Sequence, residues 1–288
     1  MKKILIHLEA DAKASVFDQI TAYDAGVDQV IAYGGVQIEE VTNLVYGAMF
    51  TRGGEGLKNT AIFIGGTNVP TAELIMKKVV KTFFGDVRVS VMFDANGSNT
   101  TAAALVKKIA HGRDLKGKKA LVLGGTGPVG IRAAVLLAEE GCEVLLSSRQ
   151  LSRAQEVSKH ILENHGVKVT PVEIAGPENA QKIISEARIN IAACSGAPGV
   201  QMLDQETWAN ALSLEIIADI NAVTPLGVAG MKVTDNGKER EGKILYGAIA
   251  IGNLKMKVHR AAIQSLFQSN NQVLDFSAIY EIARKMEG

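Results

Sequence analysis

Three glycines at a fixed spacing constrain the fold of this chain more than any other feature. Residues 119–130 (KALVLGGTGPVG) run from an apolar stretch into Gly125-x-Gly127-x-x-Gly130, and a helical pattern follows. In a strand–turn–helix unit, one such glycine makes the tight turn, one lets the backbone approach a pyrophosphate, and one lets the helix pack on the strand. A second apolar stretch, 143–146, lies where the next strand should be, so the pattern favours a dinucleotide-binding turn over an ordinary glycine-rich loop. The candidate cofactor contacts of the motif are Gly125, Thr126, Gly127, Pro128, Val129 and Gly130.

The end of the second strand indicates which dinucleotide is bound. Folds that bind NAD usually carry Asp or Glu about 20 residues beyond the glycines, where the carboxylate binds the ribose 2′-hydroxyl. This chain instead has Ser148 and Arg149 there, with Arg153 one helical turn later. A hydroxyl and two guanidinium groups suit a 2′-phosphate, which arginine grips through paired charged hydrogen bonds. We therefore expect NADP as the cofactor. The alternative is that both arginines only flank the start of a helix.

The composition is that of a globular protein with a large core and no polyanionic partner. Of the 288 residues 47% are apolar, and 31 basic side chains balance 30 acidic ones. This balance argues against a nucleic acid or an anionic membrane surface as partner. No apolar run approaches the roughly 20 residues that span a bilayer. The N-terminal apolar stretch is broken by His7 and Glu9, which favours a first strand over a signal peptide, and we expect a cytoplasmic protein.

Cysteine and histidine usage gives no sign of a disulfide or a metal. Cys142 and Cys194 lie in apolar surroundings, which is typical of buried reduced thiols. The five histidines lack the HxH or HExxH spacing of a zinc site, so no metal is expected.

Strand-like and helix-like segments alternate along the chain, which predicts a parallel α/β architecture. Strands are expected at residues 4–8, 29–33, 60–64, 87–93, 120–123, 143–146, 168–172, 189–193 and 214–219, and an apolar segment at 243–251. Helices are expected at residues 15–23, 38–49, 71–84, 253–266 and 277–286, and a further one opens in the polar segment 94–101.

A charged connector at residues 114–119 marks the best domain boundary. We expect a two-domain protein with its active site in the cleft between the domains. Residues 1–113 form an α/β substrate domain, completed by C-terminal helices of residues 253–288 that pack back on it. Residues 114–252 form a Rossmann-type dinucleotide-binding domain.

Further candidate ligands follow the ends of predicted strands, where open α/β sheets bind their ligands. Ser195 and Gly196 follow one strand and Asn221 another, and these three are candidate cofactor contacts. The segment 94–101 (DANGSNTT) offers carboxylate, amide and hydroxyl groups at the end of a strand. In the alternative interpretation Asn96 and Gly97 form a turn and Ser98 or Asn99 caps the next helix, and both interpretations can hold at once. Asp18 lies on an otherwise apolar stretch, for which solvent exposure is the default explanation.

Two lysines in the C-terminal region are candidates for the active site. Lys255 and Lys257 flank Met256, and on a helix they are separated by about 200°, so only one can face a given cleft. A lysine beside NADP would raise the local positive potential or bind an anionic or carbonyl group of the substrate. Solvated lysines on a helix face are the common case. His259 lies on the face of Lys255 and is interpreted as structural.

With these segments placed, the chain resembles the NADP-dependent methylene-tetrahydromethanopterin/methylene-tetrahydrofolate dehydrogenases of methylotrophic bacteria over essentially its whole length. The most specific motifs are NGSNTTAA at residues 96–103 and GNLKMKVHR at residues 252–260. The others are SVFD at 15–18, YD at 23–24, TRGG at 51–54, TAIFI at 60–64, GTGPVG at 125–130, ADINA at 218–222 and PLG at 225–227.

The resemblance implies a homo-oligomeric enzyme, with a trimer as the first expectation. It would oxidise the methylene bridge of a one-carbon-loaded tetrahydropterin to a methenyl bridge and reduce NADP. Such a reaction needs neither a metal nor a strong general base, since two nitrogens stabilise the cation that forms. The family's active-site lysine maps by motif to Lys255, and Lys257 is the less favoured candidate. The implied pterin contacts are Asp18, Asn96, Ser98, Thr100 and Thr101.

Two other functions stay open at the level of sequence. A shikimate- or amino-acid-dehydrogenase-like enzyme should show a Lys–Asp pair in the first domain, whereas the candidate lysine here lies in the C-terminal helices. A non-catalytic NADP-binding sensor would bind the cofactor without turnover and expose a large apolar patch. The choice between tetrahydromethanopterin and tetrahydrofolate also stays open, because these pterins share their reactive rings and differ in their tails. Whether the protein has an additional cyclohydrolase activity stays open too.

Overall fold

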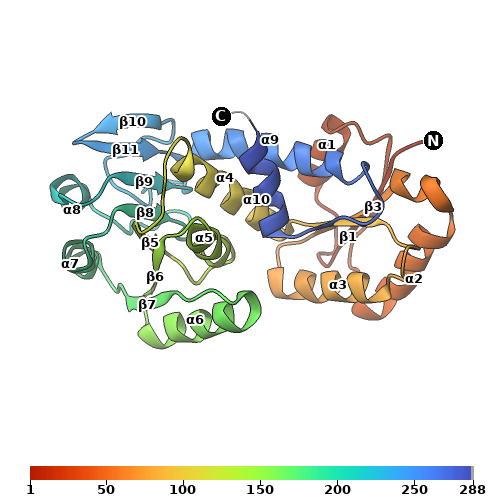
Figure 1. The fold of residues 1–288 in the computed structure, drawn as a ribbon, viewed down its shortest axis with the longest axis horizontal. Coiled ribbons are helices and arrows are strands. Elements are labelled where there is room, and N and C mark those ends of the chain that lie inside the picture. Colours follow the sequence, from red (N-terminus) through yellow and green to blue (C-terminus); the bar gives the residue numbers. More distant parts are fainter. Residues whose placement is uncertain (287–288) are drawn as a thin grey trace. The chain divides into compact units, whose positions relative to one another are not determined.

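The computed structural model describes residues 1–286, apart from the side chain of Pro177, and these residues form two compact units (Figure 1). Unit 1 comprises residues 1–100 and 256–286, and unit 2 comprises residues 101–255. Each unit is built on its own largely parallel sheet, which confirms the α/β class. The units divide within α4 (Ser98–Ala110) and α9 (Ala248–Ser265). The sequence placed these boundaries at residues 113 and 253, just beyond α4 and inside α9.

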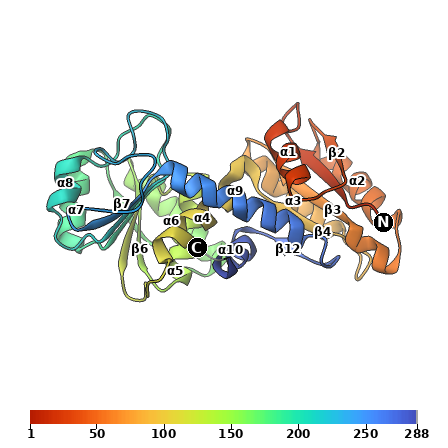
Figure 2. The same cartoon turned by 90° about the horizontal axis from the view of Figure 1, so that it is seen from above.

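The sheet of unit 1 has the strand order β12-β4-β3-β1-β2, and all its neighbouring strands are parallel. Its strands are β1 (Ile4–Glu9), β2 (Gln29–Tyr33), β3 (Thr60–Gly65), β4 (Ser90–Phe93) and β12 (Val273–Leu274). Its complete helices are α1 (Val16–Asp24), α2 (Ile38–Phe50), α3 (Val69–Thr82) and α10 (Phe276–Lys285), with 3₁₀ turns at Gly54–Asn59 and Ala95–Gly97. The four expected strands are confirmed. The C-terminal segment adds β12 beside β4 (Figure 2), and its two residues are too few to show a periodicity.

The two faces of this sheet differ in character because side chains alternate along each strand. Leu8, Ile62 and Ile64 point into an apolar core that includes residues of α2 and α3. The alternate positions His7 and Phe63 lie on the opposite face, where their rings are in edge-to-face contact. That second face carries the polar groups described below.

The sheet of unit 2 has the strand order β10-β11-β9-β8-β5-β6-β7, with only β10 antiparallel to its neighbour. Its strands are β5 (Lys119–Leu123), β6 (Glu143–Ser148), β7 (Thr170–Glu173), β8 (Ile191–Cys194), β9 (Ile216–Asp219), β10 (Asn236–Arg240) and β11 (Lys243–Tyr246). Without β10, this is the 3-2-1-4-5-6 order of the Rossmann fold. The order reverses between β5 and β8, so the ligand-binding crevice is expected at the carboxyl ends of these strands.

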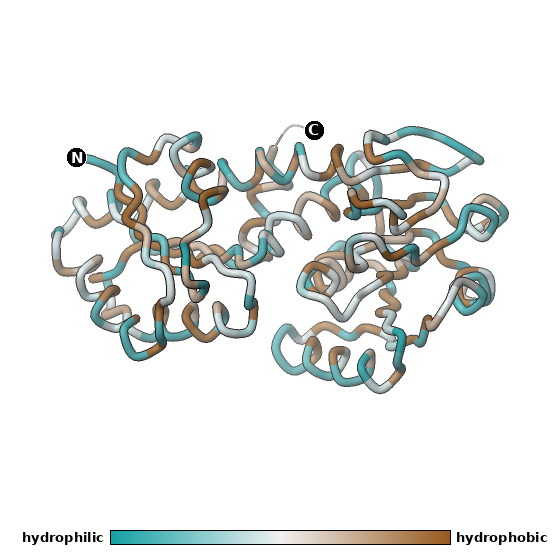
Figure 3. Tube along the Cα trace, turned by 180° about the vertical axis from the view of Figure 1, so that it is seen from behind, coloured by the Kyte–Doolittle hydropathy of each residue, from teal (hydrophilic) through white to brown (hydrophobic). Residues whose placement is uncertain are grey.

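The helices of unit 2 pack on the apolar strands of its sheet. The helices are α5 (Pro128–Glu139), α6 (Leu151–His165), α7 (Pro177–Ala187) and α8 (Gln205–Asn210). Leu121 and Leu123 of β5 share one core with residues of α7 and α8. In Figure 3 the apolar residues concentrate along the strands, whereas α6 shows polar residues over much of its length.

The apolar segment 243–251 divides into two elements. β11 ends at Tyr246 and α9 begins at Ala248. Gly247 joins them where the backbone is crowded, because a Cβ there would collide with the Lys232 carbonyl.

Within residues 1–286, no helix is both long enough and apolar enough to cross a bilayer.

Candidate functional site

The glycine turn of unit 2 is crowded at two of its three motif positions. A Cβ at Gly130 would lie 2.7 Å from both the Gly124 carbonyl oxygen and Gly125 Cα. A Cβ at Gly125 would lie 2.8 Å from the Leu146 side chain. Gly127 differs, because a Cβ there would meet only the Gly124 carbonyl oxygen, at 3.6 Å. Packing therefore requires glycine at positions 125 and 130, and Gly127 leaves room for a ligand to approach the backbone.

The N-terminus of α5 follows directly and suits an anion. Gly127 is its N-cap residue and Pro128 occupies the first turn, where its missing N–H costs nothing. Among the described residues no side chain caps this end. Unpaired N–H groups and the positive end of the helix dipole favour a phosphate here. The room at Gly127 and this helix end therefore fit the pyrophosphate of a dinucleotide.

The three residues predicted to bind a 2′-phosphate surround the start of α6. Ser148 is the last residue of β6, and Arg149 follows it with an exposed side chain. Arg153 lies in the first turns of α6, where its Nη1 donates to Glu156 Oε2 at 2.7 Å. Because Arg153 shares its charge with an acid on its own helix, Arg149 is the stronger candidate of the two arginines.

The structure adds an acidic residue that sequence reasoning missed. Ser148 of β6 pairs in register with Glu173, the last residue of β7. Glu173 Oε2 accepts the N–H of Leu151 at 3.0 Å, so its carboxylate lies at the N-terminus of α6. This acid stands beside the candidate 2′-phosphate contacts. Only the β6–β7 register brings it there, and no local sequence pattern shows that register.

Ser195 and Gly196, at the end of β8, support the glycine turn from the neighbouring strand. The Ser195 hydroxyl donates to the Leu123 carbonyl at 3.0 Å. Gly124 has φ +68°, and a Cβ on it would lie 2.7 Å from Gly196 Cα. Both residues lie at the carboxyl edge of the sheet, as predicted for cofactor contacts.

Asp219 organises the loop after β9, which contains Asn221. The buried Asp219 carboxylate accepts the N–H groups of Asn221 at 2.9 Å and Val228 at 3.0 Å. Burial raises the pKa of the Asp219 carboxyl, and these backbone donors oppose the shift. Asn221 donates in turn to the Pro225 carbonyl at 3.1 Å. The loop is therefore held by its own polar groups, with Asn221 as one of them.

In unit 1 the polar segment after β4 folds around Asp94. The buried Asp94 carboxylate accepts the N–H groups of Asn99 and Thr100, each at 2.9 Å, and the Thr100 hydroxyl at 2.6 Å. The Ser98 hydroxyl donates to the Ala95 carbonyl at 2.7 Å. The cap is therefore Asp94, whereas the alternative interpretation of this segment gave that role to Ser98 or Asn99, and Ser98 and Thr100 act here as hydroxyl donors. Sequence reasoning did not single out Asp94, although a carboxylate ahead of a helix start is a signal for this role.

Asn96 and Thr101 are the more accessible members of the same segment. Asn96 is exposed and adopts a left-handed conformation with φ +54°, and its N–H donates to the Gly66 carbonyl at 2.8 Å. Thr101 is half-buried on α4. Of the five predicted pterin contacts, these two and Asp18 keep exposed surface.

Asp18 lies near the segment after β4, with the His259 ring between Asp18 and Asp94. Asp18 Oδ1 lies 3.9 Å from His259 Nε2, and Asp94 Oδ2 lies 3.8 Å from His259 Nδ1. The His259 ring stacks on Phe63 with centroids 5.7 Å apart. Unit 1 therefore brings Asp18 and the segment after β4 together around one buried imidazole.

The two candidate lysines lie on different faces of α9, as their spacing predicts. Lys255 is buried, with 9% of its surface exposed, whereas Lys257 is exposed. His259, one turn after Lys255, is fully buried. Lys255 is thus the lysine on the packed face of the helix.

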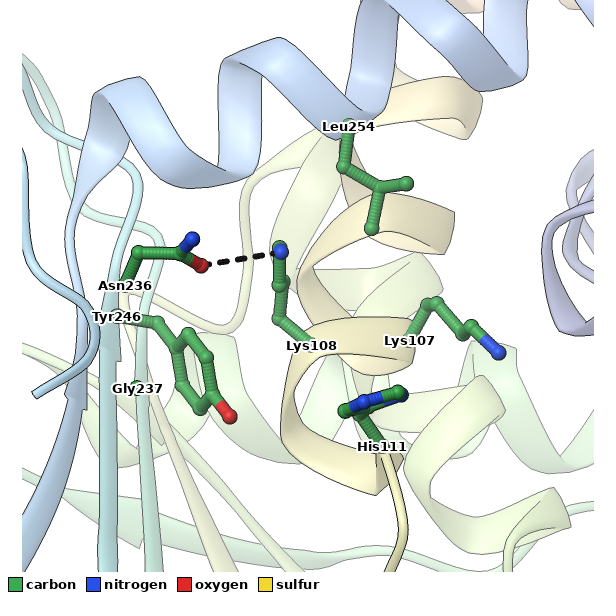
Figure 4. Close-up of a pocket in the computed structure, with 7 residues that line it drawn as sticks. All are labelled: Lys107, Lys108, His111, Asn236, Gly237, Tyr246 and Leu254. Carbon is green, nitrogen blue, oxygen red and sulfur yellow. Dashed lines mark hydrogen bonds between the residues drawn. The ribbon is translucent and has the colours of Figure 1, made fainter. Parts of the chain in front are cut away.

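A pocket in unit 2 has no residue of the glycine turn in its lining (Figure 4). It has a volume of about 280 Å³ and is lined by Lys107, Lys108, His111, Asn236, Gly237, Tyr246 and Leu254. Lys108 Nζ donates to Asn236 Oδ1 at 3.0 Å across it. Lys107 and Lys108 occupy the last turn of α4, where cations complement the negative end of the helix dipole. These lysines thus have a structural explanation, and none of the predicted site residues lines the pocket.

Comparison with known proteins identifies relatives over the whole chain. A family profile described as methylene-tetrahydromethanopterin dehydrogenase, N-terminal, matches residues 16–96. The bifunctional protein MdtA of Methylorubrum extorquens is 46% identical over 287 residues, which is 99% of each chain. The NAD(P)-dependent methylenetetrahydromethanopterin dehydrogenase of the same organism is 31% identical over 299 residues and covers 100% of both chains.

Among solved structures, quinate dehydrogenase from Corynebacterium glutamicum in complex with NAD has a similar fold. The TM-score is 0.52, with 14% identity and 98% of each chain covered. At this identity the likeness concerns the fold alone.

Proposed function

The chain belongs to the methylene-tetrahydromethanopterin dehydrogenase family, and from that premise we propose that it oxidises the methylene bridge of methylene-tetrahydromethanopterin to a methenyl bridge by transferring a hydride to NADP. Methylene-tetrahydrofolate is the second candidate substrate, because it carries the same bridge between two nitrogens. The observation that carries the proposal is the likeness over the whole chain to a relative named NAD(P)-dependent methylenetetrahydromethanopterin dehydrogenase.

This reaction requires positioning more than acid–base catalysis. The carbon that loses the hydride lies between two nitrogens, whose lone pairs stabilise the cation that forms. NADP, when bound, supplies the hydride acceptor. Gly127 and the N-terminus of α5 would hold its pyrophosphate, and Ser148 and Arg149 would hold its 2′-phosphate.

We assign Lys255 an electrostatic and orienting role toward the pterin. It is the buried member of the lysine pair, and the family resemblance maps the active-site lysine to it. Asp18, Asn96 and Thr101 are the proposed pterin contacts, because these three keep exposed surface. Ser98 and Thr100 contribute by shaping the turn that carries them.

The two domains expected from the sequence have different roles in this proposal. We propose that residues 1–113 with 253–288 recognise the pterin and that residues 114–252 bind NADP. We further propose a cytoplasmic homo-oligomer, with a trimer as the first expectation. Two free, buried cysteines agree with a reducing compartment.

A spectrophotometric assay for reduced-cofactor formation tests the proposal. Purified protein is offered methylene-tetrahydromethanopterin or methylene-tetrahydrofolate, each with NADP and separately with NAD. We expect turnover with NADP and at least one of the pterins. If calorimetry shows that the protein binds NADP but none of these pairs is turned over, the dehydrogenase proposal is wrong and the hypothesis of a non-catalytic NADP-binding sensor takes its place.

A further inference from the structure

Strand β1 and helix α1 bring together three side chains that the sequence does not group. His7 and Glu9 are two residues apart on β1, so both point to the face of the sheet opposite the apolar core. Asp18 reaches the same place from the first turn of α1. One potential donor atom from each of these residues lies within 4.8 Å of the other two.

The histidine directs its ring nitrogen into this group. His7 is 1% exposed, and its Nε2 lies 3.0 Å from Glu9 Oε2. Despite this short distance, among the described residues His7 Nε2 has no hydrogen-bond partner, so the contact lacks the alignment that a hydrogen bond needs. Such a nitrogen is a buried polar atom whose loss of contact with water is not compensated by a hydrogen bond. With the proton on Nδ1, the Nε2 lone pair is available to a ligand between the three side chains.

The backbone around the group leaves space and supports its carboxylates. Gly65 of β3 pairs with Glu9, and a Cβ on Gly65 would lie 2.9 Å from His7 Nε2 and 3.5 Å from Glu9 Oε2. Any larger residue would therefore press on the group. The N–H of Ser15 donates to Glu9 Oε2 at 2.6 Å, which fixes that carboxylate in place. Outer hydrogen bonds of this kind orient the ligands of metal ions.

The charges favour a cation. Glu9 is 3% exposed and the Asp18 side chain 16%, so two carboxylates share a largely buried site with an imidazole. Buried carboxylates are stabilised by pairing or by coordinating a metal. One imidazole nitrogen and two carboxylate oxygens form a donor set that suits Zn²⁺ and related divalent transition metals.

We propose that His7, Glu9 and Asp18 form a binding site for a divalent transition-metal ion of the Zn²⁺ class. His7 Nε2 and one oxygen from each carboxylate are its protein ligands, and water completes the coordination. The HxH and HExxH patterns miss this site because its third ligand comes from a different element. The site shares Asp18 with the proposed pterin contacts, whereas the hydride transfer itself needs no metal.

Metal binding to the full chain tests the site directly. After treatment with a chelator and desalting, we expect calorimetry to show one Zn²⁺ bound per chain. Co²⁺ should give visible absorption bands typical of an ion held by nitrogen and oxygen ligands. His7→Gln and Glu9→Gln should each weaken Zn²⁺ binding by at least about tenfold. The control His160→Gln changes an exposed histidine on α6 whose Nδ1 lies 3.2 Å from Asn164 Nδ2, and it should bind Zn²⁺ like the unchanged protein.

Circular dichroism and the thermal midpoint, measured on each variant without metal, show whether the variant folds like the unchanged protein. If His7→Gln fails to fold, Zn²⁺ binding to Glu9→Gln and the Co²⁺ spectrum of the unchanged protein still test whether the metal site exists. Absence of stoichiometric binding to the unchanged protein would overturn the site, as would equal affinity in His7→Gln and His160→Gln. None of these readouts uses turnover, so a failed dehydrogenase assay leaves the metal test unaffected.

Discussion

At the scale of single residues, the glycines of the turn separate into two kinds. A Cβ on Gly130 would collide with backbone atoms that cannot move aside, whereas a Cβ on Gly127 would meet one carbonyl oxygen at ordinary van der Waals distance. We therefore predict that Gly130→Ala lowers both the thermal midpoint and NADP affinity. Gly127→Ala should keep the thermal midpoint and weaken NADP binding by about tenfold, or about 1.4 kcal/mol. Differential scanning fluorimetry and calorimetric titration check this. Equal thermal midpoints for the two variants would contradict the assignment.

Glu173 sets the second prediction at this scale. Its carboxylate lies at the N-terminus of α6, where it would repel a 2′-phosphate on Ser148 and Arg149. Glu173→Gln removes the charge and keeps an oxygen that can accept the Leu151 N–H. We expect NADP affinity to rise about twofold to fivefold, since exposed charges interact weakly in water, with NAD affinity unchanged.

Equilibrium titration with both cofactors measures the effect of Glu173→Gln. The control Glu186→Gln neutralises an exposed acid on α7, and it should leave both affinities alone. Raising the salt concentration should shrink the gain in Glu173→Gln. An equal change for NAD and NADP would mean that Glu173 acts through the helix rather than on the 2′-phosphate.

Lys255 and Lys257 give a matched pair, because they share one helix and differ in burial. We predict that Lys255→Ala lowers kcat by about 100-fold or more, a loss typical of removing one electrostatic contact to the reacting groups. NADP affinity should persist. Lys257→Ala should retain activity. Lys255→Met keeps the apolar stem, so activity loss in both Lys255 variants excludes a packing defect. Full activity of Lys255→Met would remove the lysine from the site.

At the scale of elements, α4 depends on one residue that precedes it. Asp94 supplies the acceptor for two backbone N–H groups and a hydroxyl in a buried setting. Asp94→Ala leaves these donors unsatisfied, at about 1–3 kcal/mol each. We predict a loss of about 3 kcal/mol or more in the free energy of unfolding, measured by urea titration. Asp24→Ala, at the exposed end of α1, should change it by less than about 0.5 kcal/mol.

The elements show how far local sequence patterns reach. The strands β5 and β8 were predicted because apolar runs bounded by small residues are strong local signals. The strand β10 (NGKER) is polar and exposed, so it lacks any apolar alternation and was missed. The start of α9 was merged with β11 into one apolar segment, because only the crowding at Gly247 separates them. The glycine turn was predicted well because its constraints are local.

At the scale of the whole molecule, the groups that sequence reasoning missed come together through tertiary pairing. Glu173 reaches Ser148 through strand register, and His7 and Glu9 meet Asp18 through the placement of α1 on β1. His259 lies between Asp18 and Asp94, which are far from it along the chain. Spacing motifs detect ligands within one element. These clusters draw on two or three, so only the folded chain shows them.

The free energy of unfolding should decrease at alkaline pH because one thiol is buried. Burial, and after it the charge of Glu140, raises the pKa of Cys142 from 9.0 to about 12. Between these values the unfolded chain loses the thiol proton and the folded chain keeps it, so the stabilisation present below pH 9 is lost as pH rises. By pH 10 this loss is at most about 1.4 kcal/mol. Urea unfolding under reducing conditions, from pH 7.5 to 10, should therefore show a steeper decline for the unchanged protein than for Cys142→Ala. Other titrating groups contribute equally to both proteins, so parallel curves would mean that Cys142 ionises alike in the folded and unfolded chain.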